Sequence, residues 1–222
     1  HVETTSGILN PVEEIGRVVA RHGRRLIVDA MSGFGAIPID IAGLPCDAVV
    51  ASANKCLEAV PGVGFAVTRS EALMEGNAHS LTLDLYDQWK VFEASGEWRY
   101  TPPTHVMAAL DRALEAHTAE GAVAGRRARY EENCRTLVDG MRALGFETYL
   151  PDSLQAPIIV TFCWPADSKF VFNAFYDALA KRGFLIYPGK LTRAESFRIG
   201  CIGAIDSDTM RAAVSAVGEA MC

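Results

Sequence analysis

The chain has 222 residues, of which 50% are hydrophobic and 22% charged, and its formal net charge is −6. This is the composition of an ordinary globular protein, long enough for one large domain or two small ones. The acidic balance argues against a nucleic-acid groove, which needs a basic stripe. No apolar run approaches the ~20 residues of a membrane span. We therefore expect neither nucleic acid nor a membrane among its partners.

The cysteines and histidines are not spaced as in metal sites, redox motifs or catalytic triads. The six cysteines, which have neither a CxxC motif nor metal-ligand spacing, are Cys46, Cys56, Cys134, Cys163, Cys201 and Cys222. Reduced thiols in a cytoplasmic protein are the expected state. The five histidines have no partner at metal or triad spacing, so we predict no metal site. The chain opens with His1 in motif-like text, and we expect it to be the later part of a longer protein.

Residues 10–23 carry the signals of a helix. Asn10 can cap its start, Pro11 suits the first helical position, and Gly23 follows its end. Apolar residues recur at helical spacing between them. We predict a helix over this range.

Three apolar strands are predicted next. Residues 26–29 form the first and end at Asp29, residues 47–55 form the second, and residues 64–70 the third, with a turn or short crossover at 38–46. Strands that alternate with helical segments and are nearly all apolar indicate a parallel sheet covered on both faces.

Residues 77–103 show no sustained period, and a stretch of this length in a compact domain is usually functional or an interface arm. Two long amphipathic helices follow at 104–120 and 126–144. A smaller α/β unit comes after them, with strands at 157–162, 184–187 and 197–203 and helices at 168–182 and 207–221. We predict two domains, residues 1–120 and residues 121–222.

Asp29 and Lys55 are the first residues that suggest chemistry. Each ends a predicted strand, and the chain between them is long enough for one crossover between parallel strands. Ligands of open α/β sheets bind outside the carboxyl ends of the strands, and neighbouring strands lie ~5 Å apart. The acid and the amine would then face one pocket. The simpler alternative is a structural ion pair.

Pyridoxal 5′-phosphate (PLP) is a cofactor that needs such a pair. A lysine forms a Schiff base with its aldehyde, and a carboxylate keeps the pyridine nitrogen protonated. At the end of an apolar strand, desolvation would favour the neutral, nucleophilic amine of Lys55. Once displaced by a substrate amine, Lys55 could serve as a general base.

Several segments together resemble the class V aminotransferases, PLP enzymes of fold type I. They span the whole chain and read HVETTSG, VDAMSGFG, SANKC, SLTLDLYDQWK, TPPTHV, IYPGK and FRIGCIG. The resemblance implies an α/β fold in which part of a mostly parallel large-domain sheet precedes a smaller C-terminal α/β domain. In this family a glycine- and serine-rich phosphate loop comes before the first of these segments, so we expect the N-terminal part of the family's fold to be absent from this chain.

The resemblance also implies roles for individual residues. Lys55 would be the catalytic lysine that binds the cofactor covalently, and Asp29 would hold the pyridine nitrogen. Thr4 would lie beside the ring and Asn54 near the phosphate. Thr104 resembles a threonine that reaches the cofactor phosphate of the adjacent subunit, which implies a homodimer.

Arg198 resembles the arginine that binds the substrate carboxylate, a task that suits a planar guanidinium.

Simpler interpretations stay open for four of these residues. Thr4 and Asn54 could be turn or cap residues, and Thr104 could be a helix N-cap. Arg198 could pair with Glu195.

The implied reaction transfers the amino group of 2-aminoethylphosphonate to pyruvate and gives phosphonoacetaldehyde and L-alanine. It would belong to phosphonate catabolism in the cytoplasm. One alternative is the same chemistry between serine or alanine and glyoxylate. The other is a non-catalytic fragment of such an enzyme, which would dimerise without binding PLP productively.

Overall fold

A computed structural model describes residues 1–74, 78–191 and 193–221. Its helices are α1 Val12–Arg21, α2 Ser70–Met74, α3 Leu85–Ser95, α4 Thr104–Ala119, α5 Ala122–Ala143, α6 Phe172–Lys181 and α7 Ser207–Ala220, with a 3₁₀ turn at Asp152–Leu154. Its strands are β1 Val2–Glu3, β2 Ile8–Leu9, β3 Ile27–Asp29, β4 Ala48–Ser52, β5 Gly64–Thr68, β6 Ile159–Cys163, β7 Tyr187–Pro188 and β8 Ser196–Gly200. Residue 77, where the aperiodic segment begins, and residue 222, the end of the second predicted domain, lie outside this description.

The first sheet has the order β3-β4-β5. β3 and β4 are parallel, with Asp29 opposite Val50, as the sequence predicted. β5 runs antiparallel to β4, so the expectation of a wholly parallel sheet is wrong for this strand. The link from Ser52 to Gly64 is too short for the crossover that a parallel pair requires. β4 also ends at Ser52, and Lys55 therefore lies in the following turn rather than on the strand.

Helix α1 packs on this sheet but begins one residue later than its signals suggested. Pro11 is the N-cap, and it forms no side-chain cap hydrogen bond. Asn10 accepts the backbone N–H of Val12 through its own carbonyl, so its predicted role as a side-chain cap is wrong. Gly23 follows the helix with a φ of +59°, which fits its predicted role as the terminating glycine.

Helix α3 lies within the segment that the sequence left without regular structure. The Asp84 side chain caps its start by accepting the backbone N–H of Asp87, and Gly96 ends it with a φ of +73°. The helix buries none of its own residues. Its caps rather than an apolar stripe define it, which is why a search for periodicity missed it.

The second sheet has the order β6-β8-β7 and is antiparallel throughout. Its core lies against α5, α6 and α7 and contains an aromatic cluster with Phe146, Phe162, Phe175 and Phe197. The predicted strand at 184–187 is reduced to the short β7.

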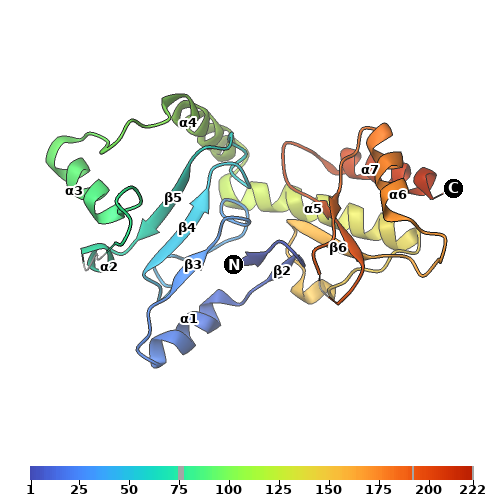
Figure 1. The fold of residues 1–222 in the computed structure, drawn as a ribbon, viewed down its shortest axis with the longest axis horizontal. Helices are drawn as coiled ribbons and strands as arrows, with labels where there is room; N and C mark the ends of the chain where they lie inside the picture. The colour runs from blue at the N-terminus through green and yellow to red at the C-terminus, as the bar shows by residue number, and fades with distance from the viewer. Residues whose placement is uncertain (75–77, 192, 222) are drawn as a thin grey trace.

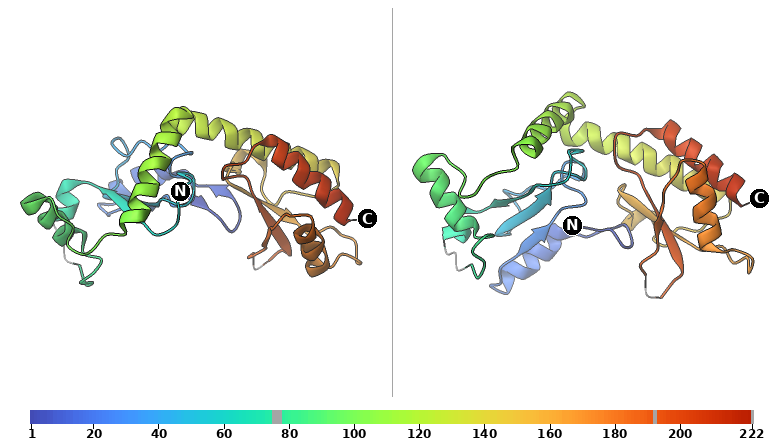
Figure 2. Two further views of the ribbon diagram at one scale, coloured as in Figure 1. Left: turned by 90° about the horizontal axis from the view of Figure 1, so that it is seen from above. Right: turned by 45° about the horizontal axis from the view of Figure 1, so that its top comes forward.

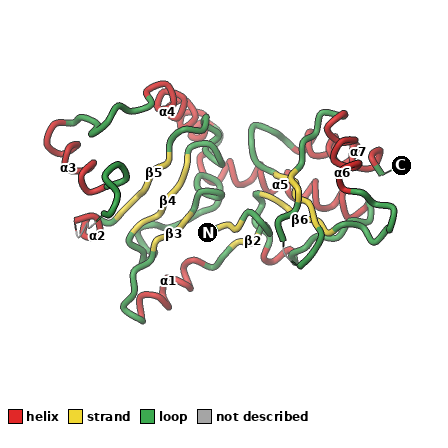
Figure 3. Tube along the Cα trace, in the orientation of Figure 1, coloured by secondary structure: helices red, strands yellow, loops and turns green. Residues whose placement is uncertain are grey.

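Helix α5 extends from the first sheet to the second (Figure 1), and two further views show the same arrangement (Figure 2). Figure 3 distinguishes the strands of the two sheets from the helices around them. The N-terminal ribbon β1-β2 reaches the second sheet, where Ile8 bridges Gln155 and the Thr161 hydroxyl donates to the carbonyl of Thr5 at 3.2 Å. The proposed division at residues 120 and 121 stays a prediction.

Two classes of feature are absent from the part of the chain that the structure describes. None of its helices combines the length and the apolar character that crossing a membrane requires. No cluster of histidine, cysteine and carboxylate side chains there could hold a metal ion.

Candidate active site

Lys55 occupies a tight turn that follows β4. Its side chain is exposed, so the burial inferred from the apolar sequence around it is not seen in the described residues. The carbonyl of Lys55 accepts the backbone N–H of Glu58 at 2.9 Å, which closes the turn. The neighbouring Cys56 is fully buried, and its thiol donates to the carbonyl of Ser32 at 3.2 Å. Burial raises the pKa of this thiol to about 12, so Cys56 packs rather than reacts.

Asp29 ends β3 at the same edge of the sheet and is also exposed. Its Oδ1 accepts the backbone N–H of Met31 at 2.9 Å, and its carbonyl accepts the terminal amine of His1 at 2.7 Å. No ion pair joins Asp29 to Lys55 among the described residues, which disfavours the simple structural pairing of these two charges.

Arg198 lies in the middle strand of the second sheet and is only 6% exposed. Its guanidinium donates to the carbonyl of Thr4 at 2.8 Å and to that of Pro188 at 3.2 Å, and it lies 5.6 Å from the centre of the Tyr187 ring. The alternative pairing with Glu195 is not formed within the described part of the chain. Because these acceptors are neutral carbonyls, the guanidinium keeps its charge available for an anion.

A cavity of about 580 Å³ brings Lys55 and Arg198 together. Its polar lining consists mainly of Thr4, Ser32, Lys55, Tyr187, Lys190 and Arg198. Three of these side chains are cationic, and no aspartate or glutamate lines the cavity among the described residues. An excess of positive charge in a concave site favours an anionic ligand.

The structure does not bring every predicted site residue to this cavity. Asn54 is exposed in the turn beside Lys55, and neither it nor Asp29 lines the cavity. Thr104 is the exposed first residue of α4 and contacts none of the others. Its alternative role as an N-cap is wrong, because Pro103 occupies the cap position.

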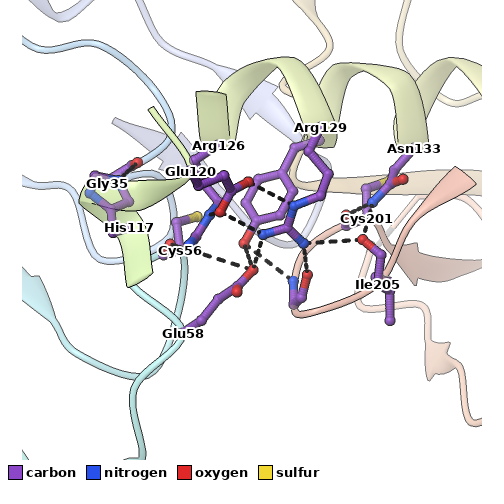
Figure 4. A network of polar contacts seen from close by, with 12 residues as sticks. Gly35, Cys56, Glu58, His117, Glu120, Arg126, Arg129, Asn133, Cys201 and Ile205 are labelled. Atoms are coloured by element: carbon purple, nitrogen blue, oxygen red, sulfur yellow. Dashed lines mark hydrogen bonds and ion pairs between the residues drawn. The ribbon is translucent and has the colours of Figure 1, made fainter. Parts of the chain in front are cut away.

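Figure 4 shows a polar network that the sequence interpretation missed. We call it the α5 network; it comprises Glu58, Glu120, Arg126, Arg129 and Tyr130. Glu58 Oε1 accepts the Tyr130 hydroxyl at 2.5 Å and Arg129 at 2.9 Å, and Arg126 donates to the carbonyl of Cys56. The network therefore binds the turn that carries Lys55 to helix α5.

The other end of the network holds the loop that follows β8. Arg129 donates to the carbonyls of Gly203 and Ile205, the latter at 3.1 Å. Next to it, the Asn133 amide donates to the carbonyls of Cys201 and Ile205, both at 3.1 Å. Glu120, at the junction of α4 and α5, accepts from both Arg126 and Arg129. Its pKa is lowered, chiefly by the hydrogen bond from Arg129.

One signal in the sequence could have revealed this network. Arg126, Arg129, Tyr130 and Asn133 recur at helical spacing, in register with the buried stripe that continues through Cys134. Charged residues on a buried helix face require partners. Glu58 is 71 residues from Arg129 along the chain and Gly203 is 73 residues from Tyr130, so no local pattern could identify these partners.

The residues present fit PLP in their chemistry. The cavity offers a primary amine at Lys55, hydroxyls at Thr4 and Ser32, and at Arg198 a guanidinium that donates to neutral carbonyls. Next to Asp29, the buried Nδ1 of His1 has no hydrogen-bond partner among the described residues. A buried polar atom of this kind normally pairs with a further group.

A family model assigns the chain to a family of proteins. The model described as "Aminotransferase class-V" matches residues 1–185. The chain belongs to the class V aminotransferase family.

Among curated proteins, a "2-aminoethylphosphonate--pyruvate transaminase 1" of Burkholderia lata is 56% identical over 100% of this chain. A "2-aminoethylphosphonate--pyruvate transaminase" of Pseudomonas putida is 53% identical over the same extent. The chain spans 60% and 61% of the lengths of these two relatives.

Solved structures confirm the fold type I α/β class. The pyridoxamine-pyruvate aminotransferase of Mesorhizobium loti matches all of this chain with a TM-score of 0.90 and 28% identity, over 58% of its own length. An alanine--glyoxylate aminotransferase of Nostoc sp. matches all of this chain and 60% of its own length, with a TM-score of 0.89 and 21% identity, which supports the fold alone.

Proposed function

We propose that the protein containing this chain is a PLP-dependent aminotransferase that moves the amino group of 2-aminoethylphosphonate to pyruvate and forms phosphonoacetaldehyde and L-alanine. The observation that carries the proposal is the cavity with Lys55, Lys190 and Arg198 and no acidic lining among the described residues. Both substrates are anions. The names of the 52–56% identical relatives support the choice of substrates.

PLP, when bound, supplies an electron sink for the substrate carbon next to the amino group. We assign Lys55 as the residue that holds the cofactor aldehyde and Asp29 as the partner of its ring nitrogen. Thr4 would lie beside its ring and Asn54 near its phosphate. In a homodimer, Thr104 would reach the cofactor phosphate of the adjacent subunit.

Lys55 and Arg198 have distinct tasks in the proposed reaction. The Lys55 amine, which is exposed, would take a proton from the amino-bearing carbon of the donor and pass it to the cofactor. In the second half of the reaction it would place a proton on C2 of the former pyruvate, which becomes L-alanine. Arg198, held by the carbonyls of Thr4 and Pro188, binds the pyruvate carboxylate and the phosphonate in turn. Its backbone partners fix the direction of the guanidinium before either anion arrives.

We also infer a cytoplasmic location, which the five described free cysteines support. The alternative amino donors and acceptors, serine or alanine with glyoxylate, would use the same Lys55 and Arg198. The anionic groups of these compounds are carboxylates, and such a group would leave the third cation of the cavity, Lys190, without an anion to bind.

The test is a product assay on the PLP-loaded protein that carries this chain. With 2-aminoethylphosphonate and pyruvate we expect stoichiometric L-alanine and phosphonoacetaldehyde. A kcat/KM at least tenfold higher for serine or alanine with glyoxylate would overturn the substrate assignment. Absence of any amino transfer would favour a non-catalytic fragment.

A further inference from the structure

One stretch of helix α5 contacts both the turn that carries Lys55 and the loop that follows the strand of Arg198. The Arg129 guanidinium lies between the Glu58 carboxylate, at 2.9 Å, and the carbonyl of Ile205, at 3.1 Å. Glu58 belongs to the turn of Lys55, whereas Ile205 belongs to the loop that leaves the strand of Arg198. Tyr130 makes a second link, because its hydroxyl donates to Glu58 and accepts the backbone N–H of Gly203 at 3.3 Å. Two neighbouring side chains of α5 thus connect the two segments that carry the predicted functional groups (Figure 4).

The Glu58 backbone indicates that the network holds this turn in place. Glu58 has a φ of +59°, a left-handed conformation that a non-glycine residue rarely adopts. Such conformations persist when surrounding contacts fix them, and they concentrate at functional sites. The contacts here are the side-chain bonds from Tyr130 and Arg129 and the backbone bond to the carbonyl of Lys55.

Charge and burial make the network rigid. The side chain of Arg126 is 2% exposed and that of Glu58 is 17% exposed, while those of Glu120 and Arg129 are each 24% exposed. Two cations face two carboxylates, so the charges balance. Moving one member would leave another charge unpaired in a poorly solvated place, which disfavours alternative arrangements.

We propose that Glu58, Arg126 and Arg129 are positioning residues, which fix the Lys55 turn relative to the Arg198 strand and thereby set the length of the amino donor that spans the site. This inference rests on the proposed function. The donor amine must reach Lys55 while its anionic end reaches Arg198, so the spacing between these two segments selects a chain length. Catalytic geometry tolerates errors of only about 0.5 Å, and α5 supplies side-chain hydrogen bonds that connect the two segments.

The experiment compares two donors that differ by one methylene, 2-aminoethylphosphonate and 3-aminopropylphosphonate, with pyruvate as acceptor. The variants are Glu58→Gln, which keeps the shape and removes the charge, and Arg129→Met, which removes the Arg129 bonds to both segments and leaves those of Tyr130. Arg127→Met is the matched control, because Arg127 lies on the same helix and, in the part of the chain that the structure describes, pairs only with the exposed Glu131. For each protein we would measure kcat/KM for both donors, the PLP dissociation constant and Tm.

The donor ratio is kcat/KM for 2-aminoethylphosphonate divided by kcat/KM for 3-aminopropylphosphonate. A difference of one methylene changes such a ratio by about 10–200-fold. We therefore expect the donor ratio to be about tenfold lower in Arg129→Met than in the wild type. We expect kcat/KM for 2-aminoethylphosphonate to fall by about tenfold in both network variants, since a misplacement of 1 Å costs up to about 10²-fold in rate. The PLP dissociation constant should rise beyond the about twofold range of the control, because a displaced Lys55 meets the cofactor aldehyde less well. Arg127→Met should stay within about twofold of the wild type.

A lower Tm with an unchanged donor ratio and an unchanged PLP dissociation constant would overturn the proposal, because the network would then contribute only to stability. If Arg129→Met does not fold, Glu58→Gln decides by the same readouts. If the wild type turns over neither aminophosphonate, the proposed function fails. The PLP dissociation constants then decide separately whether the network positions Lys55.

Discussion

Lys190 is the one cation of the cavity for which neither the sequence nor the family resemblance gave a role. It follows β7 and lines the cavity together with Lys55 and Arg198. A phosphonate offers three oxygens and up to two negative charges, whereas a carboxylate offers two oxygens and one charge. A further cation in the cavity that contains Arg198 therefore favours the phosphonate end of a donor over a carboxylate end.

Lys190→Ala should raise the KM for 2-aminoethylphosphonate by about tenfold, which corresponds to about 1.4 kcal/mol. The KM for β-alanine, its carboxylate counterpart, should change by less than about twofold, because a single charge is already met by Arg198. Steady-state kinetics with both donors measure the difference. Lys181→Ala, an exposed lysine at the end of α6 that does not line the cavity, is the control. Equal changes for both donors would contradict a phosphonate role for Lys190.

The reach of sequence reasoning differs from residue to residue. Lys55 and Arg198 could be predicted because short motifs carry them, and the structure brings both to one cavity. Asp29 was expected to face the same pocket, but it does not line the cavity among the described residues. The partners of Arg129 are remote along the chain, and Lys190 is recognised only by its place in the cavity. No local sequence pattern indicates either residue.

At the scale of elements, the close packing of α5 on α7 depends on a glycine. A Cβ added to Gly140 would lie 2.7 Å from Cγ1 and 2.8 Å from Cγ2 of Val214 on α7. Val214 is β-branched, so it has few rotamers with which to move away.

Gly140→Ala should therefore lower the free energy of unfolding by about 1–2 kcal/mol, because overpacking costs about 1–3 kcal/mol and exceeds the gain in helix propensity of about 1 kcal/mol. Denaturant unfolding measures the change. The same substitution in a Val214→Ala background should be neutral or stabilising, because the clash is gone. A destabilisation of equal size in both backgrounds would contradict the clash.

The elements that the sequence predicted well have strong periodic patterns. α4, α5 and α7 follow the predicted ranges within a few residues, since a long apolar stripe defines each. α3 was missed because its signals lie in its caps, and the direction of β5 was missed because strand composition does not encode pairing. The short link between β4 and β5 did indicate an antiparallel pair, because a parallel pair needs a longer crossover.

For the whole molecule, the α5 network predicts how stability depends on pH. The pKa of Glu120 is lowered by the hydrogen bond from Arg129 and further by Arg126. A carboxyl with a lowered folded-state pKa stabilises the protein above its unfolded pKa of about 4.3 and loses that contribution as pH falls.

We therefore expect the free energy of unfolding to decline as pH falls below about 5. Glu120→Gln should be less stable than the wild type at neutral pH, and its stability should decline less steeply below pH 5. Chemical denaturation of both proteins at a series of pH values measures this. Parallel curves would show that Glu120 contributes nothing to the pH dependence.

The central claim for the molecule is that Lys55 is the residue that binds PLP. The chain has five lysines, so attachment can be assigned by peptide mass. The measurement is borohydride reduction of the PLP-loaded protein, followed by digestion and mass spectrometry. If Lys55 binds PLP, the added pyridoxyl mass is expected on the peptide that contains Lys55 and on no other. The same mass on a peptide that contains Lys90, Lys169, Lys181 or Lys190, or no added mass at all, would contradict it.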